Sequence, residues 1–128
     1  MRHAHAYVWL GRRADFDREA ERRPAAEPFG SAVTPPLLVA HWLRRPPHLV
    51  LATFEKPEEA VDWLAERAGE YGARWWPPLR VRRERALGTL SWGGDVSWGC
   101  YVGGDRFLSL ALVSCPNRTD PDAACPLR

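Results

Sequence analysis

The chain has 128 residues, of which 45% are hydrophobic and 27% are charged, and this ordinary globular composition excludes wholesale disorder. A chain of this length buries enough surface to fold without a metal ion or a disulfide. We therefore expect one domain over residues 1–128, with an irregular tail from about residue 115. The formal net charge of +2 is too small to indicate a nucleic acid or a membrane surface as partner.

The composition also bears on source and compartment. Nearly all the positive charge is arginine, with Lys56 the only lysine, and alanine, proline and glycine are abundant, which is typical of a GC-rich bacterial genome. The sequence shows no secretory signal and no apolar run of the roughly 18 residues that a membrane-spanning helix needs. Three cysteines are an odd number, which suits a reducing compartment. We expect a cytoplasmic protein, monomeric or weakly dimeric.

The N-terminal third predicts a strand, a long loop and a hairpin. Residues 3–10 predict a strand with His3, His5, Tyr7 and Trp9 on one face. Periodicity is lost from Arg13 to Pro36, where a short charged helix over 15–23 and a long loop are expected. Residues 37–43 and 49–54 are rich in leucine, valine and aromatic residues and predict a hairpin that turns at 44–47.

The clearest helix begins at Pro57, followed by two glutamates that suit the helix dipole, and runs to about Tyr71 with Gly72 as a left-handed cap. Its apolar stripe is formed by Ala60, Val61, Leu64, Ala65, Ala68 and Tyr71.

The remainder predicts strands. Residues 79–86 are dense in arginine on both faces and predict an edge strand. Two Gly-Gly-Asp turns predict an antiparallel meander over 87–92, 96–102 and 106–114, with Trp98 beside Ala111 and on the face of Phe107 and Val113. The expected fold is α+β: a mostly antiparallel sheet of about six strands, open or curled as a half-barrel, with one main helix packed on it.

Histidine and cysteine are the residue types that could bind a metal here. His3 and His5 project from one strand face about 7 Å apart, a spacing that permits a shared metal ion. No third ligand is evident nearby in the sequence, so we interpret both as exposed histidines and expect no metal and no cofactor. Cys115 and Cys125 each precede a proline, and a disulfide between them is geometrically possible. Cys100, in mid-strand, is interpreted as a small buried hydrophobe.

Seven tryptophans in so short a chain favour a binding surface. Trp63 falls about 120° from the centre of the helix stripe, among charged residues, and is either covered by the long loop or available to a partner. Trp75 and Trp76 are held by two prolines and cannot easily share one core, so one of them is expected at the surface. Arg80 and Arg82 complete the candidate binding residues, although a solvated edge strand is the favoured interpretation of both.

No catalytic motif or cofactor loop stands out. The leading hypothesis is a non-catalytic binding protein that engages a protein or a small ligand through aromatic residues, as an immunity, inhibitor or accessory protein does. The alternative is a small cofactor-independent enzyme with a pocket inside the curled sheet. Its candidate residues would be His41, Cys100 and Tyr101, since each sits within an apolar predicted strand. The lack of a nucleic-acid fold signature disfavours an arginine-based nucleic-acid binder.

Overall fold

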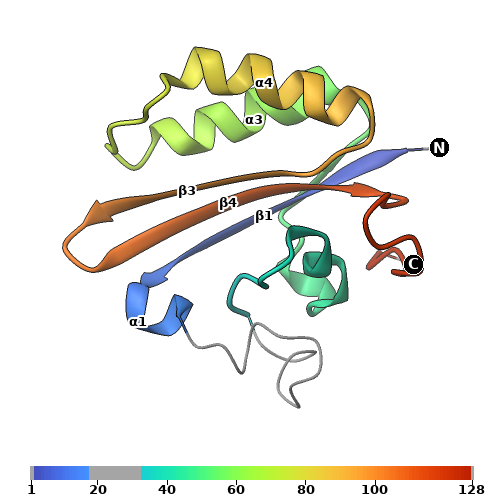
Figure 1. Ribbon diagram of the computed structural model, residues 1–128, viewed down its shortest axis with the longest axis horizontal. Coiled ribbons are helices and arrows are strands. Elements are labelled where there is room, and N and C mark those ends of the chain that lie inside the picture. Colours follow the sequence, from blue (N-terminus) through green and yellow to red (C-terminus); the bar gives the residue numbers. More distant parts are fainter. Residues whose placement is uncertain (1, 18–32, 128) are drawn as a thin grey trace.

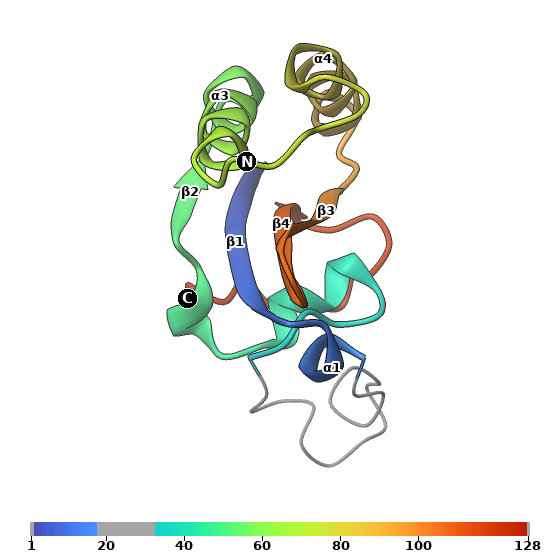
Figure 2. The ribbon, with the colours of Figure 1, turned by 90° about the vertical axis from the view of Figure 1, so that its left-hand side faces the viewer.

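A computed structural model describes residues 2–17 and 33–127 of the chain. One four-stranded antiparallel sheet, in the order β2-β1-β4-β3, carries two α-helices on one face (Figures 1 and 2). The strands are β1 (His3–Arg12), β2 (Ala52–Phe54), β3 (Val96–Gly103) and β4 (Arg106–Cys115). The helices are α1 (Arg13–Phe16), α3 (Pro57–Gly69) and α4 (Leu79–Ser91), with 3-10 turns η2 (Val39–Arg44) and η3 (Pro47–Leu49).

The predicted α+β class and antiparallel sheet are confirmed, whereas the prediction of about six strands is wrong, because the described residues form four. α3 begins at Pro57 as predicted, with acidic residues in its first turn. Gly72 takes up a left-handed conformation, with φ of +68°, shortly after the helix ends. The charged helix expected over 15–23 falls largely outside the described residues.

The helix-covered face of the sheet contains the main core. Alternate residues of β1 and β4 point toward α3 and α4, where the α3 stripe packs on them. The fully buried side chains of this layer include Val61 and Leu64 from α3 and Leu108, Leu110 and Leu112 from β4. Hydrophobic burial therefore holds this half of the molecule together.

The arginine-rich segment forms α4 rather than the predicted edge strand, and α4 also replaces the strand expected at 87–92. Arginine, glutamate, leucine and alanine all favour helix, and Pro78 stands immediately before the first turn. Ala86 and Leu90 are buried at a spacing of four residues, so the helix buries a narrow stripe and leaves its arginines at the surface.

The predicted hairpin over 37–54 is also wrong. Its first half forms η2, its turn region leads into η3, and only three residues of its second half pair as β2. The prolines at 46 and 47 interrupt any ladder there, and Ala40, Trp42 and Leu43 bury against the sheet from a 3-10 turn instead.

The register between β3 and β4 differs by one residue from the prediction. Gly103 pairs with Arg106 at the turn, but a bulge between Tyr101 and Gly103 places Trp98 opposite Leu110 rather than Ala111. A one-residue slip exchanges the faces of a strand. Trp98 therefore faces the helices with the β4 leucines instead of sharing a face with Phe107 and Val113.

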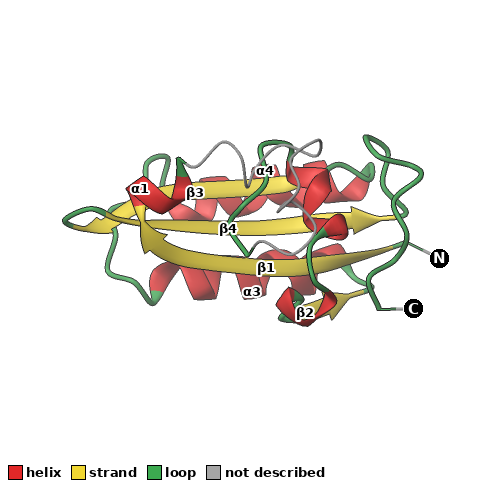
Figure 3. Cartoon of the chain, turned by 90° about the horizontal axis from the view of Figure 1, so that it is seen from below, coloured by secondary structure: helices red, strands yellow, loops and turns green. Residues whose placement is uncertain are grey.

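The opposite face of the sheet is covered by η2, η3 and the C-terminal tail, residues 116–127 (Figure 3). Tyr7 of β1 stacks on Trp42 of η2 with ring centroids 4.8 Å apart, and Ala111 and Val113 of β4 complete this smaller cluster. The tail turns back beside the sheet, so both ends of the chain lie at the same end of the molecule (Figure 1).

Candidate metal centre

The two histidines of β1 meet on the sheet face that the α-helices leave uncovered. His3 and His5 point to the same side of the strand, and their Nε2 atoms lie 3.1 Å apart. His5 is fully buried, whereas His3 is partly exposed. The Nε2 atoms of the two rings therefore meet at one point on this face.

Two cysteines complete this cluster from distant parts of the chain. Cys115 is the last residue of β4 and pairs directly with His3, so its side chain lies on the same face. Cys125 belongs to the tail, and its Sγ lies 3.6 Å from the Nε2 atom of His3 and 3.6 Å from that of His5. One ligand atom from each of the four residues lies within 4.8 Å of all the others.

Three of the six ligand-atom separations are close to those of a tetrahedral zinc site, and the pairs that include Cys115 lie within 4.8 Å. Zinc–nitrogen bonds of about 2.0–2.1 Å and zinc–sulfur bonds of about 2.3 Å place the ligand atoms of a tetrahedron about 3.3–3.8 Å apart. The nitrogen pair at 3.1 Å and the two nitrogen–sulfur pairs at 3.6 Å are close to those edges. Two thiols and two imidazoles are also the donor set of many structural zinc sites.

A hydrogen-bond network at the start of the tail fixes its path away from β4. The Asp95 carboxylate accepts hydrogen bonds from the Ser114 backbone N–H and the Asn117 side-chain amide, both at 2.9 Å. The Asn117 side-chain oxygen in turn accepts from the backbone N–H groups of Thr119 and Asp120. Asn117 is buried, so these bonds set the direction in which the tail leaves the strand.

A second anchor holds the middle of the tail. The carboxylate of Asp120 accepts two hydrogen bonds from the guanidinium of Arg44 on η2, at 2.6 and 2.9 Å. His41 Nε2 lies 3.8 Å from the same carboxylate. The bond to Arg44 holds the pKa of Asp120 below its ordinary value, so the carboxylate stays charged. Five residues further on, the chain brings Cys125 to the histidines.

Thr53 of β2 orients the buried histidine. It pairs with His5 in the sheet, and its hydroxyl lies 2.9 Å from His5 Nδ1. With Nδ1–H donating to Thr53 Oγ1, the lone pair of Nε2 points at the cluster, which is the arrangement that metal-bound histidines share. Burial, followed by the neighbouring His3, lowers the pKa of His5 to about 4, so the ring is neutral and able to bind a metal at neutral pH.

Tyr7, two residues after His5 on β1, lies near the cluster on the same face of the sheet. Burial raises the pKa of its hydroxyl, and the nearby Cys115 and Cys125 raise it further. Among the described residues the buried hydroxyl has no hydrogen-bond partner. The Tyr7 ring stacks on Trp42, so an apolar aromatic pair lies close to the cluster.

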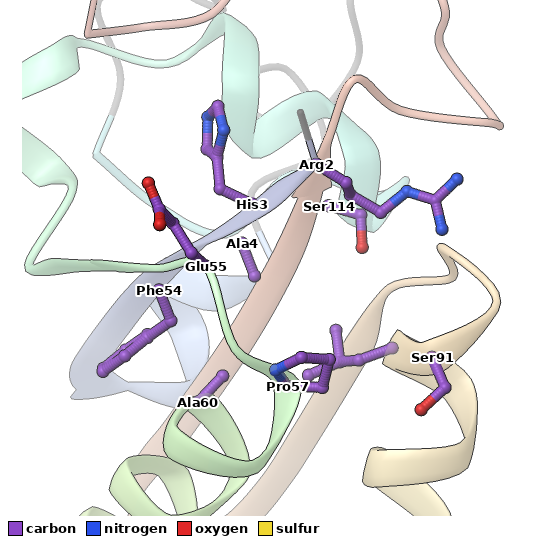
Figure 4. A pocket seen from close by; sticks show the side chains of 10 residues that line it. Arg2, His3, Ala4, Phe54, Glu55, Pro57, Ala60, Ser91 and Ser114 are labelled. Atoms are coloured by element: carbon purple, nitrogen blue, oxygen red, sulfur yellow. The ribbon is translucent and has the colours of Figure 1, made fainter.

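A pocket of about 110 Å³ lies next to His3 but on the other side of β1 (Figure 4). Its floor includes Ala4, Pro57 and Ala60, and it lies between the start of α3 and the end of α4. The His3 ring points away from those helices (Figure 4). His3 is among the residues that line this pocket, whereas Cys115 and Cys125 are not.

The predicted aromatic binding residues are separated by the fold. Trp63 is partly buried on α3, with its ring 6.0 Å from that of Phe54 and with the Arg67 guanidinium 5.2 Å from the ring centroid. Trp75 points inward, where its indole N–H donates to the Ala68 carbonyl at 3.0 Å. Trp76 is 81% exposed.

The two arginines named with those tryptophans both lie on α4, not on an edge strand. Arg80 is exposed. The guanidinium of Arg82 donates hydrogen bonds to the carbonyls of Trp76 and Pro77, at 2.7 and 3.2 Å, and lies over the rings of Trp75 and Trp98. Arg82 thus fixes the loop that carries Trp76.

The three residues proposed for an enzyme do not converge. Cys100 faces the α-helices, and Tyr101, the next residue, faces the opposite side. His41 lies on η2 rather than on a strand, beside Asp120 of the tail. The reason for grouping them, a common position within apolar strands, does not hold for His41.

Comparison of the chain with protein-family models, curated proteins and solved structures finds no match. Among the described residues, no helix has the length and apolar character needed to cross a membrane. The interpretation of the cluster therefore depends on its own geometry.

The spacing of His3 and His5 permits a shared metal ion, but the interpretation of both as exposed histidines is wrong for His5, which is fully buried. The disulfide that the sequence permits between Cys115 and Cys125 is not formed in the structure. The signal that could have joined them to His3 and His5 was composition: two histidines on a terminal strand and two cysteines near the other end. Only the β1–β4 pairing shows that these ends meet.

Proposed function

We propose that this protein binds one zinc ion through His3, His5, Cys115 and Cys125. The observation that carries the proposal is the convergence of four ligand atoms, all within 4.8 Å of one another, from β1, the end of β4 and the tail. Thiolate and neutral imidazole together favour zinc over magnesium or calcium, which prefer oxygen ligands.

The site is of the structural kind. Four protein ligands leave no position for a water molecule, whereas catalytic zinc sites keep one position open. His5 and Cys115 are buried, and the buried Tyr7 ring lies near both cysteines. The role that fits is to fasten the tail across the sheet, because Cys125 is the one ligand outside the strands.

Metal titration of the full chain tests the proposal. Cobalt(II) in place of zinc gives visible absorption bands characteristic of tetrahedral thiolate coordination, and zinc added afterwards should displace it. We expect one ion per chain and nanomolar or tighter affinity, about 12 kcal/mol of binding free energy. Cys115→Ser, Cys125→Ser and His5→Ala should each weaken zinc binding at least about 100-fold.

Matched controls exist within the same chain. Cys100→Ser removes the remaining cysteine, which lies on the helix-covered face, and His48→Ala removes an exposed histidine of η3. Both variants should bind zinc as the unchanged chain does. Loss of binding in Cys100→Ser, or full binding in Cys125→Ser, would contradict the ligand assignment.

Recognition of a partner through aromatic residues remains a second candidate function, and one observation supports it. Trp76 is 81% exposed, yet Arg82 holds its loop through hydrogen bonds to two carbonyls. A large apolar ring on a fixed loop loses little conformational freedom on binding, which is typical of interface hot spots.

Alanine substitution tests this second candidate. Trp76→Ala should leave the free energy of unfolding within about 0.5 kcal/mol of its original value and weaken binding of the partner at least about tenfold. Trp75→Ala is the comparison, since its partly buried indole packs on Trp98 and its loss should cost stability instead. A partner that binds Trp76→Ala at full strength would exclude a role for this tryptophan.

A further inference from the structure

Two sulfur atoms of the proposed zinc site are placed to react with each other. Cys115 Sγ and Cys125 Sγ lie within 4.8 Å, since all four ligand atoms do. A disulfide needs the two sulfurs at about 2.05 Å, so one side chain must move. Cys115 is fixed at the end of β4, but Cys125 lies in a tail segment without regular secondary structure.

The two thiols differ in access to solvent. Cys115 is 4% exposed, whereas Cys125 is only partly buried. A small oxidant in solution therefore meets Cys125 first. Cys115 is the resolving thiol within reach, which is the pairing that redox-sensitive cysteines share.

We propose that hydroperoxides oxidise Cys115 and Cys125 to a disulfide and thereby release the metal. This inference rests on the proposed zinc site. In the first step the Cys125 thiolate attacks the peroxide, takes one oxygen as a sulfenic acid, and the other oxygen leaves as an alcohol or water after taking up a proton. In the second step the Cys115 thiolate attacks that sulfur, the S–S bond forms, and the expelled hydroxide takes up a proton to give water.

The electrons and ligands balance in this sequence. The two sulfurs lose two electrons in total, and the peroxide gains them. The zinc ion itself is not redox-active and keeps its charge. It loses both thiolate ligands, and two imidazoles alone are too few to complete a tetrahedral site.

The tail stays attached to the sheet in both states. Zinc joins Cys125 to β1 and β4, and the disulfide joins it directly to β4. Only the reduced, metal-free chain leaves the end of the tail without a metal or covalent link, held by the contacts of Asn117, Asp120 and Ala123. Oxidation therefore replaces the zinc link between the tail and the sheet by a disulfide link, and it releases the zinc ion.

The test uses the full chain loaded with zinc. Hydrogen peroxide is added in stoichiometric amounts, zinc release is followed with a coloured chelator, and the products are mapped by mass spectrometry without reductant. We expect one zinc ion released per Cys115–Cys125 disulfide formed, with a mass loss of two hydrogen atoms. Dithiothreitol and fresh zinc should restore the original complex.

Cys100→Ser is the matched control and should release zinc in the same way, since Cys100 faces the helices. Zinc retained at several equivalents of peroxide, or released with Cys115 and Cys125 unlinked, would overturn the oxidation proposal alone. A chain that holds no zinc before peroxide is added would overturn the proposed function as well.

Discussion

On one face of the sheet, leucines from β4 and the apolar stripe of α3 form a continuous apolar layer. On the other face, the tail is held against the 3-10 turns and the strands by hydrogen bonds and an ion pair. Leu108, Leu110 and Leu112 need only to be apolar and close-packed. Asn117, Asp120 and Cys125 each need particular partners at particular distances. The helix-covered face therefore supplies stability, and the tail-covered face supplies chemistry.

The largest expected change in the free energy of unfolding comes from a substitution on the helix-covered face. Leu64→Ala removes a fully buried side chain of α3 and should lower the free energy of unfolding by roughly 2–5 kcal/mol, measured by denaturant titration. Glu66→Ala, an exposed position on the same helix, should cost less than about 0.5 kcal/mol. Equal losses in the two variants would show that the division between the faces is wrong.

Removal of zinc should act on the tail-covered face alone. At a free zinc concentration about 100-fold above Kd, binding stabilises the folded chain by about 2.7 kcal/mol, and a chelator abolishes that gain. The helix-covered core is large enough to stay folded without the metal. Hydrogen exchange should speed up in the tail and at the His3 end of β1, with α3 unchanged; uniform loss of protection would show that one core spans both faces.

Thr53→Val tests how far the metal ligands depend on their neighbours. The substitution keeps the shape of the side chain but removes the hydroxyl that faces His5 Nδ1. Zinc affinity should fall about tenfold, or ~1.4 kcal/mol, by the same titration. Thr89→Val, at a hydroxyl that donates within α4, is the matched control and should leave zinc affinity unchanged.

The smallest expected change in stability comes from the Arg44–Asp120 ion pair that holds the tail. Asp120→Asn weakens the bond to Arg44, which is partly exposed to solvent, and should cost less than about 1 kcal/mol. The pKa of Asp120 is lowered in the folded state, so its contribution is present above the unfolded value near 3.8 and is lost as the pH falls below it. The variant should therefore differ most from the original chain at pH 7, and the difference should shrink as the pH is lowered below 3.8, a comparison best made by thermal unfolding of the zinc-free forms.

The sequence predicted elements where local pattern and tertiary structure agree. α3 was found because its apolar stripe, Pro57 and Gly72 all indicate the same helix. α4 differs from the prediction because arginines on both sides of Val81 resemble an edge strand. Only the burial of Ala86 and Leu90, four residues apart, reveals the helix. The β3–β4 hairpin was found, but its faces were exchanged because no turn signal reveals the bulge at Tyr101.

Local sequence pattern also limits how much of the candidate site could be predicted. The spacing of His3 and His5 is local, so the sequence could indicate a shared metal ion. The other two ligands depend on β1 pairing with β4 and on the path of the tail, which is set by Asn117 and Asp120. Neither the β1–β4 pairing nor the path of the tail can be predicted from the spacing of neighbouring residues.

The position of β1 in the middle of the sheet has a consequence for synthesis. β1 leaves the ribosome well before its partner β4, because His3 pairs with Cys115 and Arg12 pairs with Arg106. Contacts so distant in sequence form slowly and late. During synthesis β1 can pair with β2 before β4 is made, and a chain interrupted before Cys115 lacks two of the four proposed ligands, so the proposed zinc site is complete only once Cys125 has been made.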